Sequence, residues 1–344
     1  MSTVPLPVPS LRPPVGTAPP LVNVEGLAAA LRAVVRGEVR FGTGDRALYS
    51  TDASNYRQVP IGVVIPVDVE DAVTAILVCR DFNAPVLSRG GGTSLGGQCT
   101  NVAVVIDWTK HVNRVESVDG DARTAIVQPG TVLDEVNKAT REHGGLVFGP
   151  KPATHNHCTI GGMLGNNSCG STAQWSGTTA ANVRRMEILT YDGTRMWVGP
   201  TSQSELADIE REGGRRAEIY RNLSALVERY GDTIRERFPD LPRRISGYNL
   251  PTLLPEHGMN VAQALVGSES TCVTILRAEL ALLPEPRHVV LVLAGYPDIA
   301  TAADHVPLVN EHEPYIVEGL DHKLIEYERD RRLNTVALHE LPDA

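Results

Sequence analysis

Two glycine-rich segments carry the residue types and spacing that could do chemistry in this chain. The first, Arg89–Gly97, reads RGGGTSLGG, and the second, Thr159–Gly170, reads TIGGMLGNNSCG. Consecutive glycines permit positive φ angles, so successive backbone N–H groups can converge on an anion without obstruction by side chains. Thr93 and Ser94 add hydroxyl donors, and Arg89 adds positive charge. The pattern favours a phosphate or diphosphate site; the alternative is a plain glycine-rich turn between strands.

Two common phosphate-binding motifs do not fit these segments. A Walker A loop requires lysine directly after its last glycine. Gly91 and Gly96 have the spacing of the two glycines of that loop, but the next residue is Gly97. A G-x-G-x-x-G dinucleotide fingerprint fails at Leu95, where its third glycine belongs, and in the second segment it would need glycine at Ile160. The sequence therefore argues against classical nicotinamide binding and favours a cradle of backbone amides.

Several motifs follow one another in a fixed order over roughly residues 59–286. They are PVLSRGGGTSLGG from Pro85, VQPG from Val127, TIGGMLGNNSCG from Thr159, NV and EIL…DG from Asn182, and VGSESTCVTI from Val266. In this combination the chain resembles the FAD-binding domain of the vanillyl-alcohol oxidase / p-cresol methylhydroxylase (PCMH) superfamily. Within that superfamily it is most similar to the branch that contains the FAD-linked subunit of glycolate oxidase and the D-lactate and D-2-hydroxyglutarate dehydrogenases.

The resemblance implies an α+β fold and a division of the chain into three parts. Two α/β subdomains of PCMH type would bind FAD between them, followed by the start of an α/β cap domain. Residues 1–20 are expected to be a disordered proline-rich leader. Residues 21–286 would form the FAD-binding domain, with a helical insertion at about 202–260. Residues 287–344 would begin a substrate or cap domain that is incomplete, because the cap and iron–sulfur motifs of larger relatives do not occur in the sequence.

The resemblance also implies which residues contact the cofactor. The loop Arg89–Ser94 would wrap the FAD pyrophosphate through its amides, and the segment Pro150–Asn167 would run along the flavin. Val183 would contact the cofactor through its backbone, and Glu269 would lie near the adenosine or pyrophosphate half. The full set comprises Arg89, Gly90, Gly91, Gly92, Thr93, Ser94, Pro150, Thr159, Ile160, Gly161, Gly162, Asn167, Val183 and Glu269.

The implied function is oxidation of the CH–OH group of a 2-hydroxy acid by hydride transfer to flavin N5. The substrate would be of the D-lactate, glycolate or D-2-hydroxyglutarate type, and the electron acceptor an iron–sulfur protein, cytochrome or quinone. We expect non-covalent FAD, because Thr93 stands where some relatives attach flavin through histidine. Two alternatives stay open: an FAD-holding module inactive without a separate cap or electron-transfer subunit, and a nucleotide- or phosphate-binding protein without flavin. No catalytic residue is assigned.

Other reactive residues allow competing interpretations. A metal site is one interpretation of His155, His157 and Cys158, because alternate residues of an extended strand share one face. No further pair of ligands has suitable spacing. The alternatives are hydrogen bonds to flavin or substrate, or ordinary loop residues. No metal site is predicted. Cys158 and Cys169 are interpreted as packed small residues rather than a redox pair. Arg243–Arg244 is either a solvated face or a bidentate clamp for a substrate carboxylate.

Composition excludes several classes of protein. The 344 residues carry a net charge of −9, with 42% hydrophobic and 21% charged content, which is unlike a disordered chain or a nucleic-acid-binding protein. No apolar stretch is long enough to span a membrane. The five cysteines contain no CxxC pair and no secretory signal is apparent, so a reducing, cytoplasmic location is predicted.

Hydrophobic periodicity predicts strands and helices that alternate over the first 150 residues. Helices are expected at 26–35, 72–79 and 133–139, capped in the last two cases by Asp68 and Thr131. An Asp192–Gly193 hairpin should join strands at 186–190 and 196–198. Residues 149–177 are expected to form a long functional loop. Further strands are expected at 63–65, 85–87, 102–106, 124–128, 261–266, 271–283 and 289–294, with a helix after Asp298.

Overall fold

The computed structural model describes residues 22–241 and 243–334, and the expected leader at 1–20 lies outside this range. Its first half is built on a four-stranded sheet in the order β1-β2-β4-β3, where β2, β4 and β3 are parallel and β1 is antiparallel. Helices α1 (Val24–Val34) and α3 (Val69–Asp81) bury their apolar side chains in the core beside it. The strands are β1 (Glu38–Arg40), β2 (Gly62–Ile65), β3 (Val86–Arg89) and β4 (Val104–Asp107), and α2 (Thr43–Leu48) follows β1.

The start of α3 is fixed by two carboxylates. Asp68, the predicted cap, accepts a hydrogen bond from the Asp71 amide at 2.9 Å. The Asp71 carboxylate is buried and accepts from the amides of Arg36 and Gly37 at 2.8 and 2.9 Å. These bonds satisfy backbone donors that would otherwise be buried without partners, and they tie α3 to the segment between α1 and β1.

A second, wholly antiparallel sheet has the order β5-β6-β10-β8-β9. Burial alternates along the central strand β10 (Thr274–Ala281), as expected for a sheet covered on one face. The predicted Asp192–Gly193 hairpin is confirmed, with Gly193 at a φ of +97°. The α+β fold class is therefore confirmed. The other strands are β5 (Val115–Asp119), β6 (Thr124–Val127), β8 (Val183–Leu189) and β9 (Arg195–Val198).

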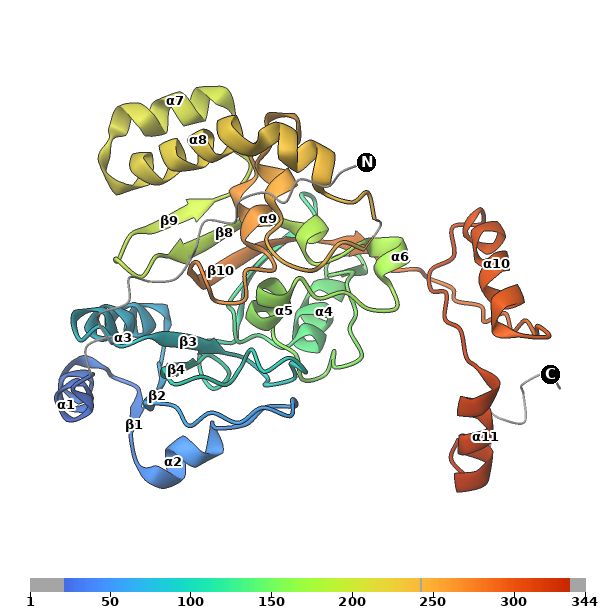
Figure 1. The fold of residues 1–344 in the computed structure, drawn as a ribbon, viewed down its shortest axis with the longest axis horizontal. Coiled ribbons are helices and arrows are strands. Elements are labelled where there is room, and N and C mark those ends of the chain that lie inside the picture. Colours follow the sequence, from blue (N-terminus) through green and yellow to red (C-terminus); the bar gives the residue numbers. More distant parts are fainter. Residues whose placement is uncertain (1–21, 242, 335–344) are drawn as a thin grey trace, which may run out of the picture.

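Helices and short strands surround this second sheet, and two of them differ from expectation. Residues 149–177, expected as a loop, contain the short helices α5 (Ile160–Asn166) and α6 (Ala173–Ser176). The apolar run expected as a strand at 261–266 forms α9 (Val261–Leu265), capped by Asn260. Figure 1 shows α7 (Gln203–Glu212) and α8 (Gly214–Arg237) as a pair beside β9. The remaining elements are α4 (Leu133–Arg141), β7 (Leu146–Val147), η1 (Ala180–Asn182), η2 (Leu250–Leu253), η3 (Pro255–His257) and β11 (Leu283–Pro284).

The last described part of the chain projects from this body (Figure 1). The strand expected at 289–294 does not form: Val289–Val292 are 70–83% exposed in irregular backbone. The helix expected after Asp298 is present as α10 (Ile299–Asn310), followed by α11 (His322–Arg331). Within the described ranges, none of the helices has both the length and the apolar character needed to cross a bilayer.

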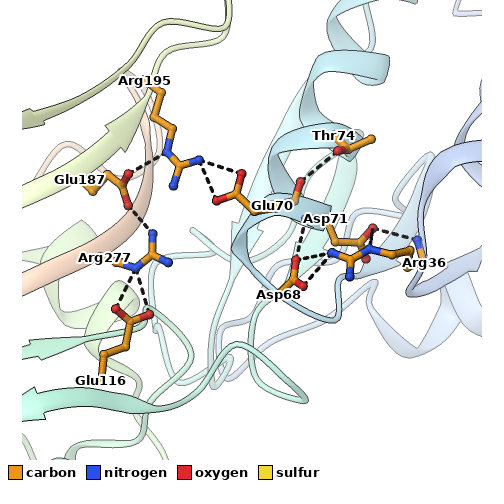
Figure 2. A network of polar contacts seen from close by, with 9 residues as sticks. All are labelled: Arg36, Asp68, Glu70, Asp71, Thr74, Glu116, Glu187, Arg195 and Arg277. Atoms are coloured by element: carbon orange, nitrogen blue, oxygen red, sulfur yellow. Dashed lines mark hydrogen bonds and ion pairs between the residues drawn. The ribbon is translucent and has the colours of Figure 1, made fainter.

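A network of charged side chains joins the two halves (Figure 2). Arg195 on β9 donates to Glu187 on β8 at 2.7 Å and to Glu70 on α3 at 2.8 Å. Beside it, the tip of the β8–β9 hairpin contacts the end of α3, where the Tyr191 hydroxyl donates to the Ala84 carbonyl at 2.8 Å. A Cβ on Gly193 would lie 2.9 Å from a Leu77 methyl group, so the hairpin tip fits closely against the helix. These contacts fix the orientation of the two sheets that flank the site described next.

Candidate functional site

The first glycine-rich segment begins where β3 ends. Arg89, the last residue of that strand, directs its guanidinium at three backbone carbonyls rather than at a carboxylate. It donates to Thr51 at 2.8 Å, Cys99 at 3.0 Å and Tyr49 at 3.4 Å. Arg89 has no ion pair among the described residues. It therefore holds the surrounding loops in place while its positive charge is not neutralised by a nearby acid.

The five backbone amides of Gly90–Ser94 donate no hydrogen bond to any described residue. Backbone N–H groups in a folded protein almost always have a partner, so a run of free donors indicates solvent or a ligand at this position. Gly92 has a φ of +66°, a backbone conformation that residues with a side chain adopt only at a cost in free energy. The segment is thus a curved row of donors suited to an anion.

The second glycine-rich segment lies against the first. Thr159 is buried and its hydroxyl caps α5, accepting from the Gly162 amide at 3.4 Å. A Cβ on Gly90 would lie 2.1 Å from the Thr159 Oγ1, and one on Gly91 would lie 2.2 Å from the His157 carbonyl. The two segments can approach this closely only because glycine occupies both positions.

Helix α5 presents different residues to the core and to the cleft. Ile160, Met163 and Leu164 are buried in the hydrophobic core. The opposite side contains Gly162 and Gly165, which line the cleft, and no protein atom would meet a Cβ on Gly165 within 4 Å. The amphipathic spacing thus places a nearly side-chain-free helix surface toward the cleft.

A cleft lies between the two glycine-rich segments. It consists of two cavities of about 60 and 210 Å³ that share part of their walls. The shared lining residues are Gly90, Ser94, Cys99, Thr159, Gly162 and Asn166. The wall contributed by the segment before β10 includes Ser268, Glu269 and Ser270. The cleft is therefore formed by both halves of the molecule.

Side chains also meet across the cleft. Asn166 on α5 donates to the Ser94 hydroxyl at 2.9 Å, and Gln98 donates to the Glu269 carboxylate at 3.5 Å. Glu269 and Ser270 both have positive φ, 50° and 63°. Two consecutive non-glycine residues in this conformation cost free energy, and such strain is concentrated at functional sites.

Two residues that line the cleft each contain a buried polar atom without a partner among the described residues. The Trp108 Nε1 donor and the Gln98 Oε1 acceptor have no hydrogen bond with any described residue, and both residues line the 60 Å³ cavity. An unpaired buried polar group costs about 1–3 kcal/mol, so its retention beside a cavity indicates a polar ligand or ordered water. Together with the free amides of Gly90–Ser94, these atoms give the cleft the donors and the acceptor that a dinucleotide requires.

The structure brings ten of the fourteen residues expected at a cofactor to this cleft. One of the ten is Gly161. Glycine is also required at this position by packing within the protein, because a Cβ would lie 2.8 Å from the Pro129 side chain. The other nine are Arg89, Gly90, Gly91, Gly92, Thr93, Ser94, Thr159, Gly162 and Glu269.

Four expected residues do not line the cleft. Pro150, Ile160 and Val183 are buried elsewhere. Asn167 ends α5 in the left-handed conformation at a φ of 49° and accepts a hydrogen bond from the Ala180 amide at 3.0 Å. Its role in the structure is to hold two backbone segments together.

Several lining residues were not anticipated. The neighbour of Asn167, Asn166, reaches the cleft, as do Gln98, Cys99 and Trp108. Helix α5 could have been predicted from the Thr159 cap and the apolar residues at 160, 163 and 164. That helix would have placed Asn166 on the side away from the core. No sequence signal identified Trp108, which the fold places in the cleft from the segment after β4.

The histidines and cysteines near the cleft take different roles. His155 Nδ1 lies 2.8 Å from the carboxylate of Asp134, at the start of α4. Thr131, the predicted cap of this helix, does not cap it and instead donates a hydrogen bond to the Gln128 carbonyl. No cluster of three potential metal ligands occurs among residues 22–241 and 243–334. Cys158 lines the 210 Å³ cavity, and burial raises the pKa of its thiol to about 11. This thiol is therefore neutral at physiological pH.

Comparison with known proteins gives consistent matches. Residues 60–199 match the family described as FAD binding domain. The chain is 30% identical to a D-2-hydroxyglutarate dehydrogenase of Pseudomonas putida over 314 residues, which cover 90% of this chain and 31% of that relative. It is 28% identical to the glycolate oxidase subunit GlcD of Bacillus subtilis, over 76% of this chain and 45% of that relative. The chain thus spans about a third of the first relative's length and less than half of the second.

A solved structure matches the fold. An alkyldihydroxyacetonephosphate synthase superimposes with a TM-score of 0.58 at 17% sequence identity, over 84% of this chain and 50% of that one. The region that matches the family, residues 60–199, includes both glycine-rich segments of the cleft.

Proposed function

We propose that the cleft holds FAD non-covalently and that the flavoprotein oxidises the CH–OH group of a D-2-hydroxy acid. The match of residues 60–199 to the FAD binding domain family supports the cofactor. The observation that carries the proposal is the row of free amides at Gly90–Ser94 beside the glycine surface of α5. Relatives named D-2-hydroxyglutarate dehydrogenase and glycolate oxidase subunit GlcD support this substrate class.

The residues of the cleft fit a dinucleotide in charge and shape. The amides of Gly90–Ser94 would bind the diphosphate, and the Arg89 guanidinium lies next to this loop, 3.0 Å from the position of a Cβ on Gly92. Gly162 and Gly165 leave the wall of α5 open to a flat ring. The Trp108 Nε1 donor and the Gln98 Oε1 acceptor would then find their partners on the cofactor.

FAD, when bound, supplies the hydride acceptor for the reaction. The protein would bind and orient the cofactor and the substrate, with the amides of the first glycine-rich segment at one end of the cleft. The hydrogen bonds Asn166–Ser94 and Gln98–Glu269 hold the two walls of the cleft together. We propose an iron–sulfur protein, cytochrome or quinone as the class of electron acceptor. All five cysteines are free, which supports a reducing, cytoplasmic compartment.

A second candidate is an FAD-holding module that needs a further domain or subunit for turnover. The apolar run Val289–Val292 favours it, since this strand-like sequence is 70–83% exposed and no described residue buries it. This candidate shares the cleft and the cofactor with the first and differs only in the activity of the chain alone.

An absorption spectrum before and after acid precipitation tests cofactor and linkage together. We expect a yellow protein that releases FAD to the supernatant. Yellow colour retained in the pellet would contradict non-covalent binding, and a colourless protein that binds ATP but not added FAD would overturn the flavin proposal.

Dye reduction tests the substrate class. We expect the FAD-loaded chain to reduce a dye with D-lactate, glycolate or D-2-hydroxyglutarate, and to leave the L-enantiomers of the chiral acids unreacted. An FAD-loaded chain that is inert with all three supports the module instead.

A further inference from the structure

Part of the loop after α8, residues 243–249, lies at the rim of the cleft. A Cβ on Gly267 would lie 3.2 Å from the Gly247 carbonyl, so the loop packs directly beside the segment that contains Ser268. The Tyr248 hydroxyl is 2.8 Å from the Thr271 hydroxyl, next to the cleft-lining Ser270. Contacts of the adjacent residues Gly247 and Tyr248 therefore fix this end of the loop at the rim.

The two arginines of this loop are in different situations. Arg244 donates to the Asn249 side chain at 3.1 Å and to the Pro239 carbonyl at 3.4 Å, and its guanidinium lies 5.3 Å from the Phe238 ring centre. Its side chain is thus occupied in shaping the loop. The sequence offered both arginines as a possible carboxylate clamp, and these contacts leave Arg243 as the available one.

Among the described residues, the Arg243 side chain has one hydrogen bond, of 3.0 Å from Nη2 to the Cys169 thiol. A thiol is a weak acceptor, whereas a guanidinium forms its strongest hydrogen bonds with carboxylates and phosphates. Arg243 has no acidic partner among the described residues, and it is exposed. Its contact places it beside Ser168, which lines the 210 Å³ cavity.

We propose that Arg243 binds the carboxylate of the 2-hydroxy acid and determines specificity for an anionic substrate. This assignment rests on the proposed function. The planar guanidinium can pair with a carboxylate through two parallel hydrogen bonds, which orients the acid as well as attracting it. The weak bond to Cys169 holds the side chain at the rim and is lost at little cost when the acid arrives.

The test measures acid binding separately from cofactor binding. The FAD-loaded full chain is titrated with D-lactate, glycolate or D-2-hydroxyglutarate, and binding is followed by the flavin difference spectrum. In Arg243→Gln we expect an unchanged FAD content and a dissociation constant for the acid raised about tenfold or more, because a charge-assisted pair is lost. Arg243→Lys should recover part of the affinity. Arg211→Gln, which changes an exposed arginine on α7, should bind like the wild type.

Each other outcome has a defined meaning. Wild-type affinity for the acids in Arg243→Gln overturns the assignment and leaves the proposed function intact. Loss of FAD from this variant also overturns it, because Arg243 would then serve the cofactor's phosphates. A wild-type chain that holds FAD but binds none of the acids overturns both the assignment and the proposed substrate class. The uncharged methyl ester of D-lactate should bind equally to wild type and variant, and a tenfold difference with this ester would contradict a carboxylate contact.

Discussion

Arg195 and Glu70 form an ion pair of 2.8 Å that connects the antiparallel sheet to helix α3 of the parallel half. The same guanidinium holds Glu187 on β8, whose side chain is only 10% exposed, and Glu187 is in turn paired with Arg277 on β10 (Figure 2). The cleft lies between these two halves of the molecule. The relative position of its walls therefore depends on the ion pairs of Arg195, which lie outside the cleft. Stability and cofactor binding are therefore linked through this network.

We predict that Glu187→Gln lowers the free energy of unfolding by about 1–3 kcal/mol. The substitution keeps the size of the side chain but removes the charge between two half-buried arginines, and hydrogen bonds to charged groups contribute that amount. Urea denaturation measures the difference. Glu210→Gln, an exposed position on α7, is the control and should change stability by less than about 0.5 kcal/mol. Equal stability of both variants would contradict a structural role for the network.

The same pair predicts a pH dependence. Burial acts to raise the pKa of Glu187, but hydrogen bonds from Arg195 and Arg277 outweigh burial and lower it below its ordinary value of 4.5. A carboxylate with a lowered pKa in the folded state contributes stability above that ordinary value and loses it as the pH falls through the folded pKa. The stability difference between wild type and Glu187→Gln should thus be largest above about pH 5 and shrink as the pH falls through the lowered folded-state pKa of Glu187. A difference that is constant over this range would show that the charge of Glu187 is not involved.

Much of the secondary structure followed from local sequence signals. Asp68 capped α3, Asp298 capped α10 and Asp192–Gly193 formed a hairpin, because each signal acts within a few residues of itself. The order of strands in the second sheet depends on long-range pairing, since β10 lies between β6 and β8 although far from β6 in sequence. The resemblance to a family indicated the α+β class but not this order of strands.

The errors have local explanations. Glycine is a poor helix former, so α5 was hidden in a segment that looked like a loop, although Thr159 caps it and the core buries its apolar side. The apolar run at α9 was too short for its periodicity to separate helix from strand. The strand expected at 289–294 has no neighbouring strand among the described residues, and a strand without pairing does not form.

Trp108 provides a test of cofactor contact from a buried position. Its indole N–H has no partner among the described residues, so Trp108→Phe removes an unpaired donor and should change the stability of the FAD-free chain by less than about 1 kcal/mol. If the N–H donates to the cofactor, the variant should bind FAD up to about tenfold more weakly. Quenching of flavin fluorescence measures this affinity. Trp175→Phe, at the contact with Tyr315, is the control and should leave FAD binding unchanged.

Two glycines of the cleft should respond oppositely to alanine. In Gly90→Ala the Cβ would lie 2.1 Å from the Thr159 hydroxyl, so the two glycine-rich segments must separate and stability should fall by about 1–3 kcal/mol. In Gly165→Ala the Cβ meets no protein atom within 4 Å, and alanine within a helix should raise stability by about 0.5–1 kcal/mol.

Gly165→Ala therefore separates folding from ligand binding. Its new methyl group projects into the cleft, where it would occupy space that the proposal assigns to FAD. We predict a more stable protein that binds FAD at least about tenfold more weakly, measured by thermal unfolding without cofactor and by FAD titration. Gly44→Ala on α2, a helical glycine outside the cleft whose Cβ would likewise meet no atom within 4 Å, is the matched control for the stability effect and should leave FAD affinity unchanged. If Gly165→Ala binds FAD as the wild type does, this side of α5 does not face the cofactor.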